Sequence, residues 1–344
     1  MTSVFFRQTA QRVYTQDMPS DARLPNAPRV SIGLPVFNGE RYVGAAIEAI
    51  LAQSFPDLEL IVSDNASTDG TEAICRDYAA RDKRVRYYRN HENLGAARNF
   101  NQTFERSSGE YFKWAAHDDV VAPDFLRECV AALDGDPSIV LCYSEMKIID
   151  ETGSVVEDYA SELANVASTD PSRRFGDLVL VDHPCYELFG LVRADVLRKT
   201  SLLRGYIASD RVLLAELGLY GRFHTIPACL FFSRDHPQRA LRSAPFHLRA
   251  EWFDPANRGH RVFPHWRFFS EYFGCVQRAP LDGRQRMRCY LSLARWPSVN
   301  LNWARMGSDV LTAFFPKTLS TLVSMKGRVA KSPIPSGRSS RAHT

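Results

Sequence analysis

Apolar residues recur with two different spacings between residues 29 and 143. Short, largely apolar runs are typical of buried strands, and stretches with an apolar residue at every third or fourth position are typical of amphipathic helices. Strands are predicted over residues 30–36, 58–62, 85–88, 111–115 and 139–143. Helices are predicted over residues 40–53, 69–78 and 95–104, and from near Pro123 to Leu133. This alternation implies right-handed crossovers and a mostly parallel sheet with helices on both faces, which is an α/β fold.

Two local signals predict where helices begin. Asp69 and Glu72 have the spacing of a capping box, in which each side chain accepts a hydrogen bond from a backbone N–H at the other end of the first turn. Pro123 stands near the first turn of the fourth predicted helix, where its missing N–H leaves no hydrogen bond unmade.

The composition fits a globular protein with one large core and a smaller appended subdomain, because the chain has 344 residues and 45% hydrophobic content. The net charge is +4, but residues 310–344 contain six basic residues and no acidic one. The basic character therefore belongs to the C-terminus. Nucleic-acid binding would rest on that tail alone, so we do not predict it.

The seven cysteines form no Cys-x-x-Cys pair and no metal-binding spacing with histidine. Most have apolar neighbours, where cysteine serves as a small core residue. This usage favours a reducing, cytoplasmic location. The N-terminus has no continuous apolar segment of the kind found in secretion signals, and no run reaches the roughly 18 apolar residues of a membrane span. We therefore expect neither.

Polar side chains gather at the carboxyl ends of three predicted strands, where ligands bind in sheets of this kind. Two adjacent carboxylates repel each other unless a cation or a proton relieves them, although they could also serve only to cap the following helix. An oxygen-rich, acidic rim suits Mg²⁺ or Mn²⁺ better than zinc. The rim residues are Phe37 and Asn38, Asp64 and Asn65, and His117, Asp118 and Asp119.

Several common motifs are absent from the sequence. It has no Gly-x-Gly-x-x-Gly after the first strand and no Gly-x-x-x-x-Gly-Lys loop, which disfavours dinucleotide and P-loop enzymes. It also lacks a Gly-x-Ser-x-Gly elbow and a His-Glu-x-x-His helix, which disfavours serine hydrolases and metalloproteases.

Three stretches of the chain resemble the family 2 glycosyltransferases, enzymes with the GT-A fold. They read "VSIGLPVFNGERYVGAAIEAILAQSFPDLELIVSDNASTDGT", "RNHENLGAARNFNQTFERSSGEYFKWAAHDDVVAPDFL" and "ASDRVLLAELGLYGRFHTIPACLFFSRDHP". The resemblance covers roughly residues 29–240. It implies a GT-A glycosyltransferase domain over residues 29–245. Residues 1–28 are polar, contain three prolines and show no clear period, so we predict a flexible extension there.

The resemblance also implies a role for each matching residue. Asp64 would accept a hydrogen bond from the nucleotide base, with Asn65 beside it, and Arg98 would lie near the base or the diphosphate. The residues expected to border the base and ribose are Pro35, Phe37 and Glu40.

The His117-Asp118-Asp119 sequence stands where the family has its Asp-x-Asp-type metal motif. Asp119 would bind the ion directly, and Asp118 would contact ribose or sugar hydroxyls. His236 stands where some members place a further metal or phosphate contact, although its Arg-Asp-His-Pro sequence also fits an exposed turn.

Asp210 occupies the position of the catalytic base in the family pattern. The residue before it is Ser209, where many members have Glu. Because an amphipathic run follows, a helix-capping role for Ser209 or Asp210 is an open alternative.

The implied reaction moves a single sugar, with inversion, from a nucleotide-diphosphate sugar to an acceptor hydroxyl. We expect a UDP-sugar donor, a glycan or glycolipid acceptor, and Mn²⁺ or Mg²⁺ as the Lewis acid that neutralises the leaving diphosphate. Such a reaction belongs to cell-surface polysaccharide or glycolipid assembly. Processive members carry Gln-x-x-Arg-Trp, whereas this chain has Ser292 in place of the glutamine ahead of Arg295 and Trp296.

Two other functions compete with this one. A sugar-phosphate nucleotidylyltransferase uses a similar sheet but needs a glycine-rich, basic loop after the first strand, and this chain lacks one. A non-catalytic nucleotide- or carbohydrate-binding protein would bind the donor without turnover.

Residues 246–326 form a region rich in aromatic residues, with four of the five tryptophans of the chain. Helical spacing is visible in residues 290–296 and 310–325. We predict a mainly helical extension, followed by a basic, disordered tail over residues 327–344. Three interpretations stay open: a cap over the acceptor side, a peripheral contact with an anionic membrane on its cytoplasmic face, or a helical subdomain with a solvated tail.

Overall fold

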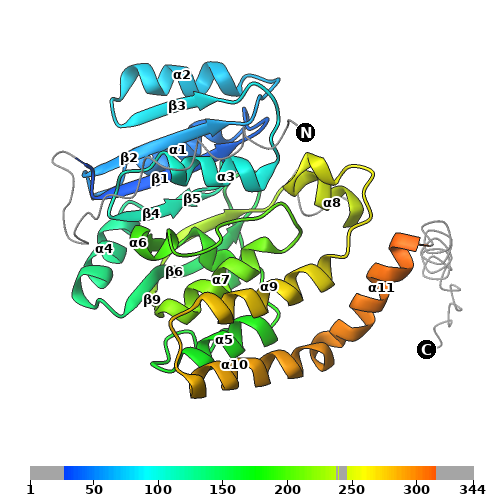
Figure 1. Ribbon diagram of the computed structural model, residues 1–344. Coiled ribbons are helices and arrows are strands. Elements are labelled where there is room, and N and C mark those ends of the chain that lie inside the picture. Colours follow the sequence, from blue (N-terminus) through cyan, green and yellow to red (C-terminus); the bar gives the residue numbers. More distant parts are fainter. Residues whose placement is uncertain (1–26, 238, 240–245, 315–344) are drawn as a thin grey trace, which may run out of the picture.

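A nine-stranded sheet lies at the centre of the computed structural model, which describes residues 27–237, 239 and 246–314 (Figure 1). The strands are β1 (Val30–Val36), β2 (Leu58–Asp64), β3 (Val85–Arg89), β4 (Tyr111–Trp114), β5 (Val120–Val121), β6 (Ile139–Ile149), β7 (Val155–Tyr159), β8 (Leu191–Arg193) and β9 (Arg222–Arg234). Their order across the sheet is β3-β2-β1-β4-β8-β6-β9-β5, with β7 paired to β6.

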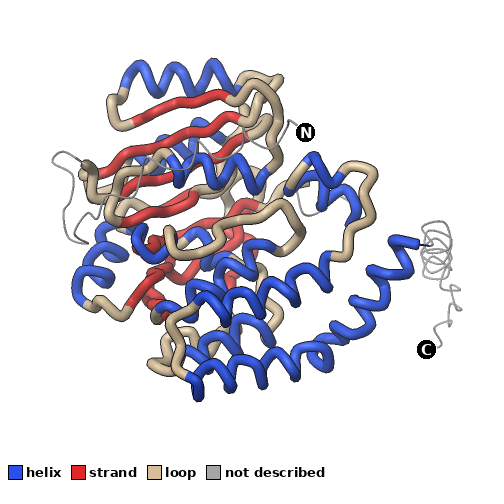
Figure 2. The backbone as a smooth tube through the Cα atoms, in the orientation of Figure 1, coloured by secondary structure: helices blue, strands red, loops and turns tan. Residues whose placement is uncertain are grey.

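The helices lie on both faces of this sheet (Figure 2). They are α1 (Val43–Leu51), α2 (Thr71–Arg81), α3 (Ala96–Glu105), α4 (Phe125–Gly135), α5 (Pro171–Leu180), α6 (Ala194–Leu197), α7 (Ser209–Tyr220), α8 (Phe246–Phe253), α9 (Pro264–Arg278), α10 (Gly283–Arg295) and α11 (Asn302–Phe314). Three short 3-10 helices are η1 (Tyr186–Phe189), η2 (Pro255–Asn257) and η3 (Trp296–Leu301).

The predicted mostly parallel sheet is confirmed. Strands β1 to β4 pair in parallel, and β6 pairs in parallel with β9. The exception at the centre is β8, which runs antiparallel between β4 and β6. The carboxyl ends of β1, β2 and β4 therefore meet at one edge, as the crossover argument requires.

The helix α2 begins close to the predicted position, but the predicted capping box does not form. The carboxylate of Asp69 accepts from the N–H of Thr71 and from the N–H of Glu40. The side chain of Glu72 pairs instead with Arg76, one turn further along the helix. Asp69 therefore ties the start of α2 to the loop after β1.

The strand β4 shows why the central strands read as apolar runs. Phe112 and Trp114 pack into the hydrophobic cluster on one face of the sheet, and Tyr111 packs into the cluster on the other face. Successive side chains of a strand point to opposite faces, so a strand covered on both sides is largely apolar. Lys113 is an exception in β4, since it is buried with its Nζ donating to the carbonyl of Phe189.

The C-terminal helices pack on the core. Tyr272 of α9 and Trp296 of η3 are buried in the same cluster as residues of α5 and α7, and the ring of Trp296 stacks on Phe269 with centroids 4.9 Å apart. Among the residues that the structure describes, no helix is both long and apolar enough to cross a membrane.

Some predictions fall on residues outside the described ranges. These are the flexible extension up to residue 26, the basic tail over residues 327–344, and the part of the 310–325 helix that follows Phe314. The predicted boundary at residue 245 stays a prediction.

Candidate active site

A cavity of about 1060 Å³ opens beyond the carboxyl ends of β1, β2 and β4. It is lined by the loops after these strands, by η1, by the start of α7, by the residues after β9 and by α8. Eight of the ten predicted site residues line it: Pro35, Phe37, Glu40, Asn65, Asp118, Asp119, Asp210 and His236. The chain thus brings together residues that lie up to two hundred positions apart in the sequence.

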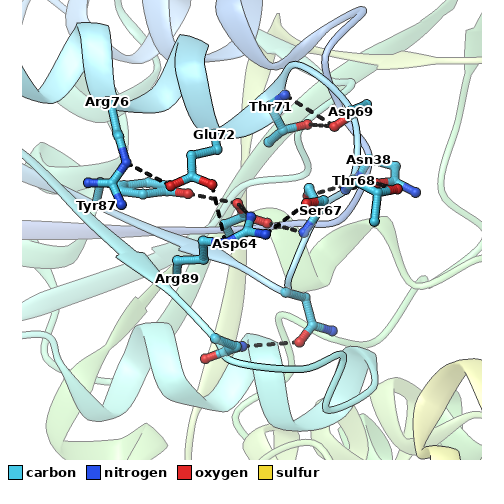
Figure 3. Close-up of polar contacts among 12 residues, drawn as sticks. Asn38, Asp64, Ser67, Thr68, Asp69, Thr71, Glu72, Arg76, Tyr87 and Arg89 are labelled. Carbon is cyan, nitrogen blue, oxygen red and sulfur yellow. Dashed lines mark hydrogen bonds and ion pairs between the residues drawn. The ribbon is translucent and has the colours of Figure 1, made fainter.

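Asp64 lies below the cavity floor and does not line it. Its side chain is fully buried, and its carboxylate accepts from the N–H of Ser67 (2.8 Å), the hydroxyl of Tyr87 (2.7 Å) and the guanidinium of Arg89 (2.9 Å), as Figure 3 shows. Ser67 in turn accepts from the N–H of Asn38 in the loop after β1. Asp64 therefore fixes the shape of the floor, and a direct contact with a base stays a prediction.

Asn65 shapes the loop that leads into α3. Its side-chain oxygen accepts from the N–H of Leu94, and its side-chain nitrogen donates to Asn93 and to the carbonyl of Gly95. Gly95 has φ +81°, and a Cβ there would lie 2.6 Å from the carbonyl oxygen of Phe253. Only glycine suits this position, because the backbone is left-handed and the segment after α8 touches it.

The structure does not bring Arg98 to the cavity. Its side chain is 57% exposed and pairs with Glu105 at 2.9 Å. On α3 the residues that line the cavity are Ala96, Ala97, Asn99 and Phe100, and a rotation of 100° per residue places Arg98 on the other side of the helix. The predicted base or diphosphate contact of Arg98 is therefore not supported by this geometry.

Asp118 and His236 form a buried pair at the cavity wall. The Nε2 atom of His236 lies 2.9 Å from Oδ2 of Asp118. Burial works to raise the pKa of Asp118, but the hydrogen bond from His236 and the charges of His117 and Arg239 outweigh it and hold that pKa below its usual value. Asp118 is thus a carboxylate that stays ionised beside an imidazole nitrogen.

Asp119 points in a different direction from Asp118. Its Oδ1 accepts from the backbone N–H of Arg234 at 2.8 Å. Burial, followed by repulsion from Asp118, raises the pKa of Asp119 to about 7. The carboxylate beside His236 is thus Asp118, and Asp119 anchors the loop to β9, whereas the predicted roles of the two toward an ion and a sugar stay predictions.

Neither aspartate caps α4. The helix starts after Asp124, whose carboxylate accepts from the hydroxyl of Ser54 and pairs with Arg127. The capping alternative for Asp118 and Asp119 is therefore excluded.

Arg234 was not predicted from the sequence. Its Nε donates to the carbonyl of Asp118 (3.0 Å), and its Nη1 donates to the carbonyl of Asp150 (2.9 Å). Its guanidinium also lies 4.9 Å from the ring centroid of Tyr42, which packs against the ring of His236. The side chain of Arg234 thus fixes the backbone of Asp118 and, through the ring of Tyr42, packs behind His236.

Arg239 is a second residue that the sequence argument missed. It lines the cavity, donates to the hydroxyl of Ser233 at 3.1 Å and lies over the ring of Tyr186. Its electrostatic interaction with Asp118 and Asp119 places a positive charge at their side of the cavity. In the sequence, the signal that pointed to Arg239 is its position three residues after the predicted site residue His236.

Asp210 lines the cavity from the second position of α7. The N-cap of that helix is Ala208, with φ +64°, and it makes no side-chain capping bond. Capping by Ser209 or Asp210 is therefore wrong. Asp210 accepts from the N–H of Arg211, and burial raises the pKa of Asp210. A carboxylate with a raised pKa is a stronger base than an exposed aspartate.

The metal-ligating side chains in this cavity suit a divalent ion only if a bound ligand fills the remaining coordination positions. Among the described residues, no group of three or more His, Cys, Asp or Glu side chains is arranged to bind a metal. Asp118 and His236 supply one oxygen and one nitrogen. Mg²⁺ is commonly bound through one or two carboxylates together with phosphate oxygens and water, so Asp118 supplies a suitable oxygen, whereas the imidazole of His236 suits this ion less well. A metal at this pair stays a prediction.

A family model described as "Glycosyl transferase family 2" matches residues 31–194. The chain carries a family 2 glycosyltransferase domain. The domain includes β1 to β4 and the Asp118–Asp119 loop, whereas Asp210 and His236 lie beyond the matched range.

Relatives of this glycosyltransferase domain come from several bacteria. An uncharacterized glycosyltransferase of Rickettsia typhi is 35% identical over 126 residues, which are 36% of this chain and 38% of that protein. A putative glycosyltransferase, EpsE, of Bacillus subtilis is 34% identical over 129 residues, which are 37% of this chain and 46% of that protein. The matches thus span less than half of either relative.

Solved structures show that the fold is GT-A. The TarS fragment 1–349 of S. aureus in complex with UDP-GlcNAc has a TM-score of 0.58 at 16% identity, covering 83% of this chain and 81% of that one. The mannosyltransferase PcManGT of Pyrobaculum calidifontis, in complex with GDP-Man and Mn²⁺, has a TM-score of 0.52 at 17% identity, covering 89% of this chain and 81% of that one. The predicted fold, with its helical C-terminal region, is confirmed.

Proposed function

We propose that the protein transfers one sugar from a nucleotide-diphosphate sugar to an acceptor hydroxyl, with inversion at the anomeric carbon. The observation that carries this proposal is the meeting, in one cavity, of the Asp118–His236 pair and the buried carboxylate of Asp210. The family 2 domain, which supplies most of the residues that line this cavity, supports it.

The donor would lie along the loops after β1 and β2. Phe37 is 42% exposed at the cavity, so its ring is free to cover a base, with Pro35 and Glu40 beside it. Asn65 fixes the opposite loop. A UDP-sugar is our proposed donor, and the TarS complexes with UDP and UDP-GlcNAc support that choice.

The diphosphate would lie against Asp118, His236 and Arg239. Asp118 and His236 would hold Mn²⁺ or Mg²⁺, and the bound ion would neutralise charge that grows on the leaving diphosphate. The Mn²⁺ complex of PcManGT supports a metal in this fold. The guanidinium of Arg239 adds a fixed positive charge on the same side.

Asp210 would remove the proton from the acceptor hydroxyl as the new glycosidic bond forms. Because an oxygen that attacks from the face opposite the leaving group inverts the anomeric carbon, the proposed reaction needs a single base beside the acceptor, and Asp210 lines the same cavity. The raised pKa of Asp210 makes this proton transfer easier than it would be for a solvated aspartate.

The acceptor we propose is a glycan or glycolipid hydroxyl in the assembly of cell-surface polysaccharide or glycolipid. Trp252 is 40% exposed at the cavity wall, and a flat aromatic face of this kind suits a sugar ring. All seven cysteines are free, which supports a reducing, cytoplasmic setting.

The test is UDP release from a panel of UDP-sugars in the presence of Mn²⁺. Slow release from one sugar, stimulated by an added acceptor, is the expected result. Binding of the donor without any turnover would instead identify a non-catalytic binding protein. Turnover of a sugar phosphate with a nucleoside triphosphate would identify a nucleotidylyltransferase.

A further inference from the structure

Large hydrophobic side chains are exposed mainly at the C-terminal end of the described chain. Of the thirteen that are exposed among the described residues, ten lie between residues 252 and 314. Helix α11 alone carries four of them, and Figure 1 shows it at the edge of the molecule, beyond α9. The four are Trp303 (63% exposed), Val310 (38%), Leu311 (51%) and Phe314 (51%).

These four residues share one face of α11, because they stand at positions i, i+7, i+8 and i+11 of the helix. The opposite face anchors the helix to α9. There Asp309 accepts from the N–H and from Nδ1 of His265, and the carbonyl of Met306 accepts from the indole N–H of Trp266. These hydrogen bonds fix one face of α11 against α9, so the four apolar side chains on the other face point away from α9.

The region that carries this face is rich in arginine. Residues 261–314 contain eight arginines and three acidic residues, and three of these arginines pair with carboxylates: Arg267 with Glu271, Arg278 with Glu216 and Arg288 with Asp170. Two of the acidic residues, Glu271 and Asp309, are buried and bonded, and Asp282 caps α10. The guanidinium of Arg261 lies 4.6 Å from the ring centroid of Phe314. Beyond Asp309 the sequence carries six more basic residues and no acidic one.

We propose that this face of α11 binds the surface of an anionic lipid bilayer. A helix with an apolar face flanked by cations lies in the plane of such a surface, with its apolar side chains at the boundary between headgroups and acyl chains. Basic residues within a Debye length add attraction to anionic headgroups.

A second copy of the chain is a poorer occupant of this face. A two-fold interface would place the same surface patch of both copies together, so it would bring the Arg261 side chains of both copies into one interface. Like charges that face each other across an interface oppose association.

The test is sedimentation of the full chain with phosphatidylcholine vesicles, with and without 30% phosphatidylglycerol. We expect partitioning onto the anionic vesicles to exceed that onto neutral ones by about tenfold or more, and to fall on raising NaCl from about 0.1 M to 0.5 M. The double variant Trp303→Ser/Phe314→Ser should lose about tenfold in partitioning. Its thermal unfolding midpoint should match that of the unmodified chain, because both side chains are exposed.

The matched control is Val155→Ser/Val156→Ser, which removes two apolar side chains that are 52% and 58% exposed on β7. It should keep full vesicle binding. Absence of sedimentation, equal binding to neutral vesicles, or an equal loss in the control would overturn the proposal. So would light scattering that shows a dimer dissociated by Trp303→Ser/Phe314→Ser.

Discussion

Two adjacent carboxylates in the loop after β4 have opposite surroundings and therefore different roles. Asp118 faces His236 and the cavity, whereas Asp119 faces the backbone of Arg234. The first is kept ionised by its partner, and the pKa of the second is raised to about 7 by burial and by its neighbour. The difference between them predicts different effects of the same substitution.

The titration of Asp119 predicts a pH dependence of stability. Because the pKa of Asp119 is higher in the folded chain than the ordinary value near 4, the folded state binds a proton that the unfolded state has released between these two pH values. Stability from this group is fully present below about pH 4 and falls as pH rises to about 7, by about 1.4 kcal/mol per unit. Asp119→Asn should remove that part of the slope in urea unfolding from pH 4.5 to 7.5. An unchanged slope would contradict the assignment.

Asp210 predicts a change in catalysis without a change in donor binding. Asp210→Asn should lower turnover by about 10² to 10⁴ while the affinity for UDP stays within a few-fold. Turnover by the unmodified enzyme should fall as the pH drops through the raised pKa of Asp210, because only the carboxylate accepts a proton. If the turnover of the unmodified enzyme falls only below pH 4, or if Asp210→Asn keeps full turnover, the catalytic base is another residue.

At the scale of elements, the site depends on contacts between segments that are distant in the sequence. The loop before α3 touches the segment after α8 at Gly95, and the end of β9 fixes the loop after β4 through Arg234. The predicted strands β1 to β4 and helices α1 to α4 agree with the structure to within a few residues, because each is long enough to show its period.

Three of the strands that were not predicted are short or interrupted. β5 and β8 have two and three residues, too few for a period. β9 is long, but it contains Pro227 and its pairing with β6 shifts register between Ser144 and Glu145. The different surroundings of Asp118 and Asp119 could not be predicted from the sequence. They depend on the hydrogen bond from Arg234, which lies 115 residues after Asp119 in the chain.

A substitution at Gly95 tests the contact between the loop before α3 and the segment at the end of α8. Gly95→Ala should lower the free energy of unfolding by about 1 to 3 kcal/mol, since the new Cβ meets the carbonyl of Phe253 in a left-handed backbone. Gly135→Ala, at the end of α4 with nothing within 4 Å, is the matched control and should be neutral or slightly stabilising. Equal effects in chemical denaturation would show that Gly95 is not constrained.

At the scale of the whole molecule, the C-terminal helices share the core with the glycosyltransferase domain and also contribute to the cavity through α8. The aromatic richness of this region was visible in the sequence, but its partners were not. Trp296 illustrates the difficulty, because its burial depends on Phe269 and on the helices α5 and α7, which no local pattern connects to it.

The two tryptophans of this region predict opposite effects on folding. Trp296→Ala should cost about 3 to 5 kcal/mol, because the ring is 2% exposed in the core. Trp303→Ala should change stability by less than about 0.5 kcal/mol, because that ring is 63% exposed. Urea unfolding measures both, and a small cost for Trp296→Ala would show that the helices fold apart from the domain.

The most direct test of the proposed site is calorimetric titration of UDP in the presence of Mn²⁺. The unmodified chain should bind UDP only when Mn²⁺ is present. Asp118→Asn should weaken binding by about tenfold or more, because it removes the charged ligand, whereas Asp119→Asn should stay within a few-fold, because its amide oxygen still accepts from Arg234. If Asp118→Asn binds UDP as tightly as the unmodified chain while Asp119→Asn loses binding, the proposed site is wrong and Asp119 is the residue that binds the ion.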